Sequence, residues 1–118
     1  LQVVIFAQME LLGRLARVTN FIDRVALKYI INPLSEEETA DMIQFRLRSA
    51  GLPYGRSLFS HEAVSVIHRF TQGYPRQIAL LCHNALESLV IHEKSIVDAV
   101  LVEELIRHES RWLREAAA

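Results

Sequence analysis

This sequence has little cysteine and no excess of charge of one sign, and each shortage excludes a class of protein. Cys82 is the only cysteine in 118 residues, which excludes a disulfide within the chain and a zinc site built from several cysteines. The formal net charge is −1, so no basic excess points to nucleic acid, although near-neutrality leaves such binding open. No apolar run is long enough to cross a bilayer. The five histidines are scattered, and no two of them lie four residues apart with a supporting acid, as in a zinc protease. We therefore expect no metal site.

What the chain does have is a globular composition. Apolar residues make up 51% of it, which is enough to build a core and too much for a disordered chain. Its length corresponds to one domain or to a part of one. The chain opens on an apolar run without an initiator methionine or a charged lead. We therefore expect a fragment of a longer protein. Because the chain has a single cysteine, we also expect it to lie in a reducing compartment.

The first third of the chain predicts a short βαβ segment. Leu1–Ala7 and Val25–Ile31 are rich in β-branched residues and are each expected to form a buried strand. Met9–Arg17 between them is expected to form the crossover helix of a parallel pair. Two parallel strands leave open edges and uncovered faces, so we expect residues 1–33 to be an incomplete piece whose other strands precede Leu1.

Residues 34–118 predict a domain of four helices. Ser35 and Glu38 form a capping-box pattern, and Gly51 is expected to end that helix. The second helix is expected to begin after Ser60 and the third at Pro75; the fourth begins after either Ser95 or Asp98. Cys82 belongs to the apolar stripe of the third helix and is expected to be a core residue rather than a nucleophile. The fold class expected for the whole chain is mainly α with a short βαβ segment.

Gly73-Tyr74-Pro75-Arg76 forms the junction between the second and third helices. Glycine suits the position after a helix end, and proline suits the first position of the next helix. Arg76 then falls in the first helical turn, where the helix dipole disfavours a cation by roughly 0.3–1 kcal/mol. An anion bound there would relieve that cost, with help from the free backbone N–H groups. Arg76 is therefore either a solvated surface arginine or a ligand for a phosphate.

These motifs together resemble the second half of a AAA+ ATPase, in particular the general secretion pathway protein A type. The resemblance covers nearly the whole chain. It is carried by the run from Val4 to Leu11, by Ile22–Val25, by Pro33–Thr39 and by Gly73–Arg76. Ala7 and Met9 stand where that family usually has glycine and proline, and Asp23 stands where it often has another polar or basic residue.

The resemblance implies roles for individual residues. Gln8 would be sensor 1, which orients the attacking water or contacts the γ-phosphate. Arg76 would be sensor 2 and reach the γ-phosphate from the lid, with Gly73, Tyr74 and Pro75 forming the nucleotide-facing turn. Arg24 would be the arginine finger that acts on the ATP of a neighbouring subunit, with Arg14 and Arg17 as alternatives. Such cations stabilise the charge that develops during phosphoryl transfer.

The sequence contains no Gly-x-x-x-x-Gly-Lys-[Ser/Thr] phosphate loop and no acidic strand end for magnesium. The resemblance therefore implies that ATP and Mg²⁺ bind to a longer parent, and that this chain alone neither holds ATP tightly nor hydrolyses it. The implied partners are neighbouring subunits of a homo-oligomer and proteins of secretion or pilus assembly. The implied location is cytoplasmic, with an inner-membrane link through the parent.

Two alternatives remain open. One is an ATPase of the transposition-accessory type, which would act on DNA. The other is a non-catalytic helical module that binds protein or DNA, in which the Gly73–Arg76 turn is only a helix junction. The expected βαβ segment speaks against the second alternative, because such modules do not need a pair of buried parallel strands.

Overall fold

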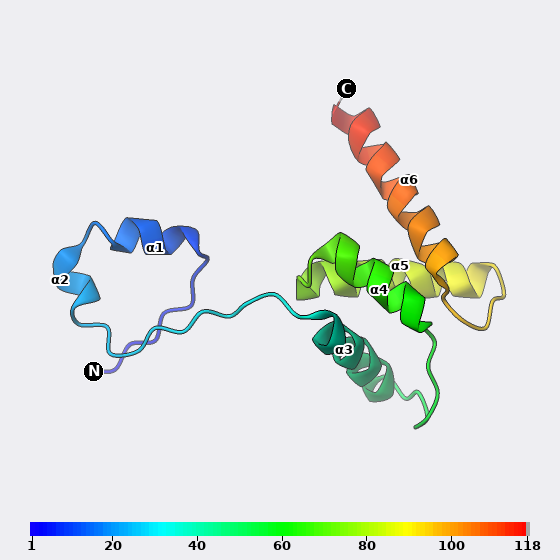
Figure 1. Cartoon of the computed structure of the whole chain (residues 1–118), viewed down its shortest axis with the longest axis horizontal. Coiled ribbons are helices and arrows are strands. Elements are labelled where there is room, and N and C mark those ends of the chain that lie inside the picture. Colours follow the sequence, from blue (N-terminus) through cyan, green and yellow to red (C-terminus); the bar gives the residue numbers. More distant parts are fainter. Residues whose placement is uncertain (118) are drawn as a thin grey trace. The chain divides into compact units, whose positions relative to one another are not determined.

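The chain forms two compact units, Leu1–Ile31 and Asn32–Ala118. The structure is a computed structural model, and it describes residues 1–117, the side chains of residues 112 and 113 excepted. The division falls two residues before the boundary placed from the sequence at residue 33. Figure 1 shows the connection as an irregular segment that leads into the first helix of the second unit.

The first unit contains two short helices, α1 (Glu10–Leu15) and α2 (Thr19–Ile22). Helix α1 is shorter than the helix expected over Met9–Arg17, and α2 was not expected. The predicted βαβ segment is wrong, because residues 1–117 contain no strand element and both Leu1–Ala7 and Val25–Ile31 are irregular. The apolar side chains of both segments are exposed except that of Val25, which is half-buried; Phe6 is 88% exposed and Leu27 is 82% exposed.

The βαβ prediction is wrong because a strand depends on partners outside its own segment. β-Branched runs favour strands only where other strands satisfy the backbone hydrogen bonds and where other elements cover the side chains. Residues 1–31 supply two such runs and two short helices without a buried residue, which cannot offset the entropy of ordering a parallel pair. The composition of these segments is typical of strands, but the sheet that a strand requires is not formed by the described residues.

The second unit is the helical domain that the sequence predicts. It consists of α3 (Glu36–Ser49), α4 (His61–Thr71), α5 (Pro75–Ile91) and α6 (Ala99–Ala117). Helix α4 contacts each of the other three helices, and α5 also contacts α3 and α6. The core lies between these helices and is formed by side chains that are almost fully buried, among them Ala63, Ile67, Ile78, Ala85, Val97 and Val102.

Side-chain caps define where three of the helices begin. The Ser35 hydroxyl accepts a hydrogen bond from the Glu38 amide at 3.1 Å, and the Glu38 carboxylate accepts one from the Ser35 amide at 2.8 Å. The expected capping box is thus confirmed, and so is Ser60, which accepts from the Ala63 amide at 3.1 Å. Asp98 caps α6 by accepting from the Leu101 amide at 2.9 Å. Of the two starts left open for the last helix, the structure therefore selects Asp98.

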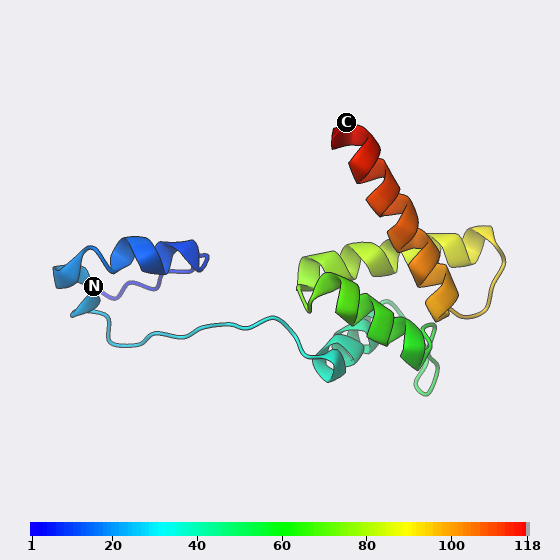
Figure 2. The same cartoon turned by 45° about the horizontal axis from the view of Figure 1, so that its top comes forward.

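A single bridge between two loops aligns the starts of α4 and α6. Phe59 and Val97 form an isolated parallel β-bridge, in which the Val97 amide donates to Leu58 at 2.7 Å and the Ser60 amide donates to Val97 at 2.9 Å. Phe59 and Val97 are both buried. The first half of α6 therefore packs on the bundle, with Leu101 and Val102 in the core, and its second half projects beyond the other helices (Figure 2).

Gly73 and Leu34 join the α4–α5 junction to the segment that enters α3. The Leu34 amide donates to the Gly73 carbonyl at 2.9 Å, and Nε2 of His68 donates to the Leu34 carbonyl at 3.1 Å. Gly73 is buried and has a φ of +79°, and a Cβ atom at this position would overlap the Leu34 carbonyl oxygen. Only glycine fits here, because the backbone is left-handed and a neighbouring backbone occupies the side-chain space.

Gly73→Ala should destabilise the chain more than Gly55→Ala, and the difference should be about 1–3 kcal/mol in the free energy of unfolding. The two glycines have almost the same φ, +79° and +78°, but a Cβ atom at Gly55 meets nothing within 4 Å. Gly55→Ala therefore measures only the backbone strain, which costs roughly 1–2 kcal/mol. Urea unfolding of both variants tests this expectation. Equal losses would show that the approach of Leu34 does not constrain Gly73.

Candidate functional site

The candidate site is the start of α5, where Arg76 is the second helical residue. Pro75 occupies the first position and has no N–H group, as the sequence predicts. Tyr74 is the N-cap residue, and its side chain makes no capping hydrogen bond. The first turn contains no acidic residue, whereas α3 and α4 both begin with a serine cap and acidic side chains. Among the described residues, nothing accepts a hydrogen bond from the amides of Arg76 and Gln77.

Two groups make the electrostatic potential at this turn positive. The helix dipole places a partial positive charge on the free N–H groups, and the exposed guanidinium of Arg76 adds a full charge. None of the ion pairs found within residues 1–117 involves Arg76. An anion is the ligand that satisfies both groups at once, because it accepts hydrogen bonds from the amides and from the guanidinium.

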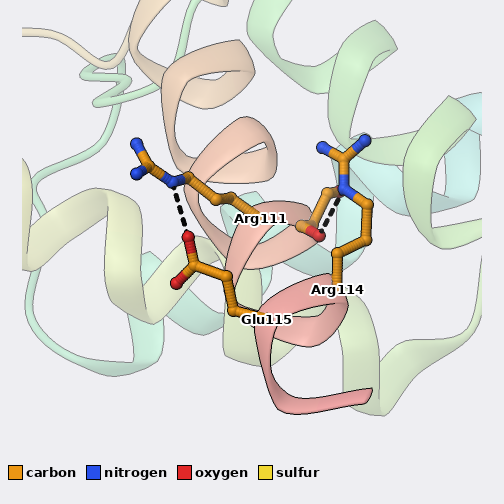
Figure 3. Close-up of polar contacts among 4 residues, drawn as sticks. Arg111, Arg114 and Glu115 are labelled. Atoms are coloured by element: carbon orange, nitrogen blue, oxygen red, sulfur yellow. Dashed lines mark hydrogen bonds and ion pairs between the residues drawn. The ribbon is translucent and has the colours of Figure 1, made fainter. Parts of the chain in front are cut away.

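Other arginines of the second unit are engaged locally. Nε of Arg111 lies 2.9 Å from the Glu115 carboxylate, one helical turn away (Figure 3). Nε of Arg114 donates to the Ser110 carbonyl at 3.2 Å, and Nε of Arg107 donates to the Glu103 carbonyl at 3.4 Å. Arg114 lies in the last turn of α6, where the dipole favours positive charge. Arg76 occupies the opposite environment.

The contact between Gly73 and Leu34 sets the position of the Arg76 turn. The left-handed backbone of Gln72 and Gly73 ends α4, and the Tyr74 amide then donates to the Thr71 carbonyl at 3.1 Å. The chain enters α5 immediately afterwards. The sequence predicted the role of Gly73 but not the left-handed Gln72, with a φ of 53°. It also gave no role at this junction to His68, which holds Leu34; a histidine on the inner face of α4 was the available signal.

Tyr74 lies beside Arg76 with its side chain 54% exposed. About half of its surface is covered, and it is not one of the residues that pack against the buried core. Its ring and hydroxyl are accessible at the side of the same turn. The four residues Gly73–Arg76 therefore form a continuous turn with one buried glycine and an exposed aromatic and cationic surface.

Gln8 and Arg24 belong to the first unit. Gln8 is exposed two residues before the start of α1, and its carbonyl accepts from the Leu11 amide at 3.0 Å. Arg24 is exposed in the turn after α2, with its amide 3.1 Å from the Phe21 carbonyl. Arg14 and Arg17 are also exposed, at the end of α1 and just after it. All four side chains are accessible, and their roles remain predictions.

Cys82 is a half-buried residue of α5 that packs against the core. Loss of solvation raises the pKa of its thiol from 9.0 to about 12, an effect that the nearby positive charge of Arg46 partly opposes. A thiol with such a pKa is almost entirely protonated at neutral pH and is a poor nucleophile. Among the described residues, no group of His, Cys, Asp and Glu is arranged to hold a metal ion.

The Cys82 thiol should therefore react slowly with iodoacetamide at pH 8 in the folded chain. The thiolate fraction changes tenfold for each pKa unit, so labelling should be roughly a thousandfold slower than in the urea-unfolded chain. Mass spectrometry of timed samples measures both rates. A folded-state rate close to the unfolded rate would show that the thiol is exposed or activated.

One curated protein is similar to most of this chain. "General secretion pathway protein A" of Aeromonas hydrophila is 34% identical over 88 residues, which is 73% of this chain. The same alignment covers only 16% of that protein, so the chain spans about a sixth of the length of the curated relative that it matches. No protein-family model matches the chain. No solved structure matches it either.

The similarity supports the resemblance to general secretion pathway protein A that the motifs indicate. It assigns no role to an individual residue. Every helix within residues 1–117 is too short or too polar to cross a membrane.

Proposed function

We propose that this chain is the sensor and lid portion of a AAA+ ATPase that works in a secretion pathway. The observation that carries the proposal is Arg76, an exposed arginine that has no ion-pair partner among the described residues and lies at the start of a helix without a capping side chain. The similarity to General secretion pathway protein A supports the same interpretation. In the longer ATPase, a nucleotide would bind with its terminal phosphate against this turn.

The chemistry explains why an arginine is needed. In phosphoryl transfer, negative charge spreads over the equatorial oxygens of the transferred group while little covalent chemistry falls to the protein. A guanidinium offers planar paired donors that match two phosphate oxygens. The amides of Arg76 and Gln77 point in the same general direction as the helix dipole, so they add donors without any rearrangement.

The turn is also coupled to the entry of the chain into the helical domain. Gly73 lies three residues before Arg76, and its carbonyl is bonded to Leu34, which follows the boundary between the two units. A shift of the turn toward a phosphate would therefore act on the backbone at Leu34. We infer that the nucleotide state changes the lid angle at Asn32–Leu34, a hinge of the kind that moves one rigid body against another.

The remaining site residues complete the proposal. Gln8 would orient the attacking water, and Arg24 would reach the ATP of a neighbouring subunit in a homo-oligomer. ATP with Mg²⁺ would bind through residues of the longer protein, which supply the phosphate loop. The energy would serve assembly of secretion or pilus machinery, with the ATPase in the cytoplasm and linked to the inner membrane.

The alternative function is that of a non-catalytic helical module that binds protein or DNA. Without paired strands in the described residues, the argument from the sequence against a non-catalytic helical module no longer holds. The similarity and the environment of Arg76 favour the ATPase, and a transposition-accessory ATPase acting on DNA would use the same lid. Unchanged nucleotide handling after loss of Arg76 would favour the non-catalytic module.

Arg76→Ala in the full-length ATPase should lower steady-state turnover about a hundredfold, as expected when one donor to the transition state is lost. Nucleotide affinity should fall less, because the other phosphate contacts remain. Arg76→Lys should recover only part of the rate, since an ammonium cannot form the paired contacts. A malachite-green phosphate assay and titration with a fluorescent ATP analogue measure the two quantities.

Arg107→Ala is the matched control. It removes an exposed arginine from the same domain, but one that bonds within its own helix. Its turnover should equal that of the wild type. If Arg76→Ala is folded, as judged by circular dichroism, and retains both turnover and affinity, the turn is only a helix junction and the proposal is wrong.

A further inference from the structure

A second exposed surface combines arginines with aromatic side chains at the far end of α3. We call it the arginine–aromatic surface and define it by four exposed residues, Phe45, Arg48, Tyr54 and Arg56. It is distinct from the Arg76 turn and plays no part in the function proposed above. No acidic residue occurs between Asp41 and Glu62, whereas this stretch contains three arginines. The surface is therefore positive in a unit whose acidic residues outnumber its basic ones.

Arg48 joins the two rings of this surface. The Arg48 guanidinium carbon is 4.6 Å from the centre of the Tyr54 ring, which is a cation–π contact. Phe45 and Arg48 are three residues apart on α3 and so are neighbours on its surface. Phe45 is 70% exposed and Tyr54 is 87% exposed, which is unusual for two large rings. Within the described residues, Arg48 and Arg56 belong to none of the ion pairs.

The loop that carries Tyr54 and Arg56 is held against α3. The amides of Gly51 and Leu52 donate to the carbonyls of Arg48 and Leu47 at 2.9 and 3.0 Å, which is the pairing of a Schellman motif. Nε2 of Gln44 donates to the Arg56 carbonyl at 2.9 Å, and the Arg56 amide donates to Pro53 at 3.3 Å. The surface is thus ordered before a partner arrives, which lowers the entropy cost of binding.

We propose that the arginine–aromatic surface binds a short acidic segment of a partner protein. Carboxylates of the segment pair with the guanidinium groups of Arg48 and Arg56, whose fork of donors matches a carboxylate. An apolar or aromatic side chain of the segment packs on Phe45 and Tyr54. Arginine and tyrosine are enriched among the residues that dominate binding energy at protein interfaces, and the stacked Arg48–Tyr54 pair supplies both.

The charge of the unit favours a short acidic segment over a nucleic acid. A nucleic acid gains affinity from many phosphate contacts along an extended basic stripe. Here the positive surface is confined to the end of α3 and its loop, and Asp41 lies one helical turn before Phe45. A polyanion that extended along α3 would meet Asp41, whereas a short segment meets only the arginines and the rings.

The test is fluorescence anisotropy of the chain with a fluorescein-labelled peptide made of Glu and Asp residues interrupted by phenylalanines. The wild-type chain should bind it saturably, and binding should weaken with added salt. Arg48→Ala and Tyr54→Ala should each weaken the affinity about fivefold or more, the loss expected for the minority of interface residues that contribute most to binding. Both side chains are exposed, so both variants should remain folded.

Arg69→Ala is the matched control, because it removes an equal charge from an exposed position on α4. Its affinity for the peptide should match that of the wild type. Absence of saturable binding, or equal losses in Arg69→Ala and Arg48→Ala, would overturn the proposal. Tighter binding to an oligothymidylate than to the peptide, lost in Arg48→Ala, would assign the surface to nucleic acid and overturn it as well.

Discussion

The backbone contact between Gly73 and Leu34 is the constraint on which the helical domain depends. It joins two segments far apart in the sequence, the entry into α3 and the junction between α4 and α5. The approach is close because Gly73 has no side chain, and His68 completes it by bonding to the Leu34 carbonyl. The contact ties the segment before α3 to the turn that carries Arg76. A structural requirement and a candidate binding site therefore share one turn.

This arrangement separates the two kinds of positive charge in the domain. Arg76 lies at a helix start that lacks a capping side chain and an acidic residue. Arg48 and Arg56 are placed by a loop that folds back on α3, next to rings that remain in solvent. Both sets are unpaired within the described part of the chain, but they suit different ligands. The first has backbone donors for a compact phosphate, and the second has aromatic surface for a side chain.

Sequence patterns predicted the helical domain well, because its signals are local. Capping at Ser35 and Ser60 depends on residues three positions away, and the apolar stripes of the helices repeat within a few turns. The first third was predicted wrongly, since a strand needs partners that lie outside its own segment. Leu1–Ala7 and Val25–Ile31 have the composition of buried strands, yet nearly all of their side chains are exposed in a unit without a sheet among the described residues.

The sequence alone determined the type of the long helices, most of their ends and the position of Arg76 in a first helical turn. Each of these is set by interactions within a few residues, so the chain carries the information locally. Only the tertiary structure showed that the Leu34 backbone occupies the space that a side chain at position 73 would need, and that His68 forms a hydrogen bond to the Leu34 carbonyl. It also decided that Arg48 stacks on Tyr54. These contacts join residues across a loop or between helices, and a local sequence pattern does not specify which distant segment will pack against a given residue.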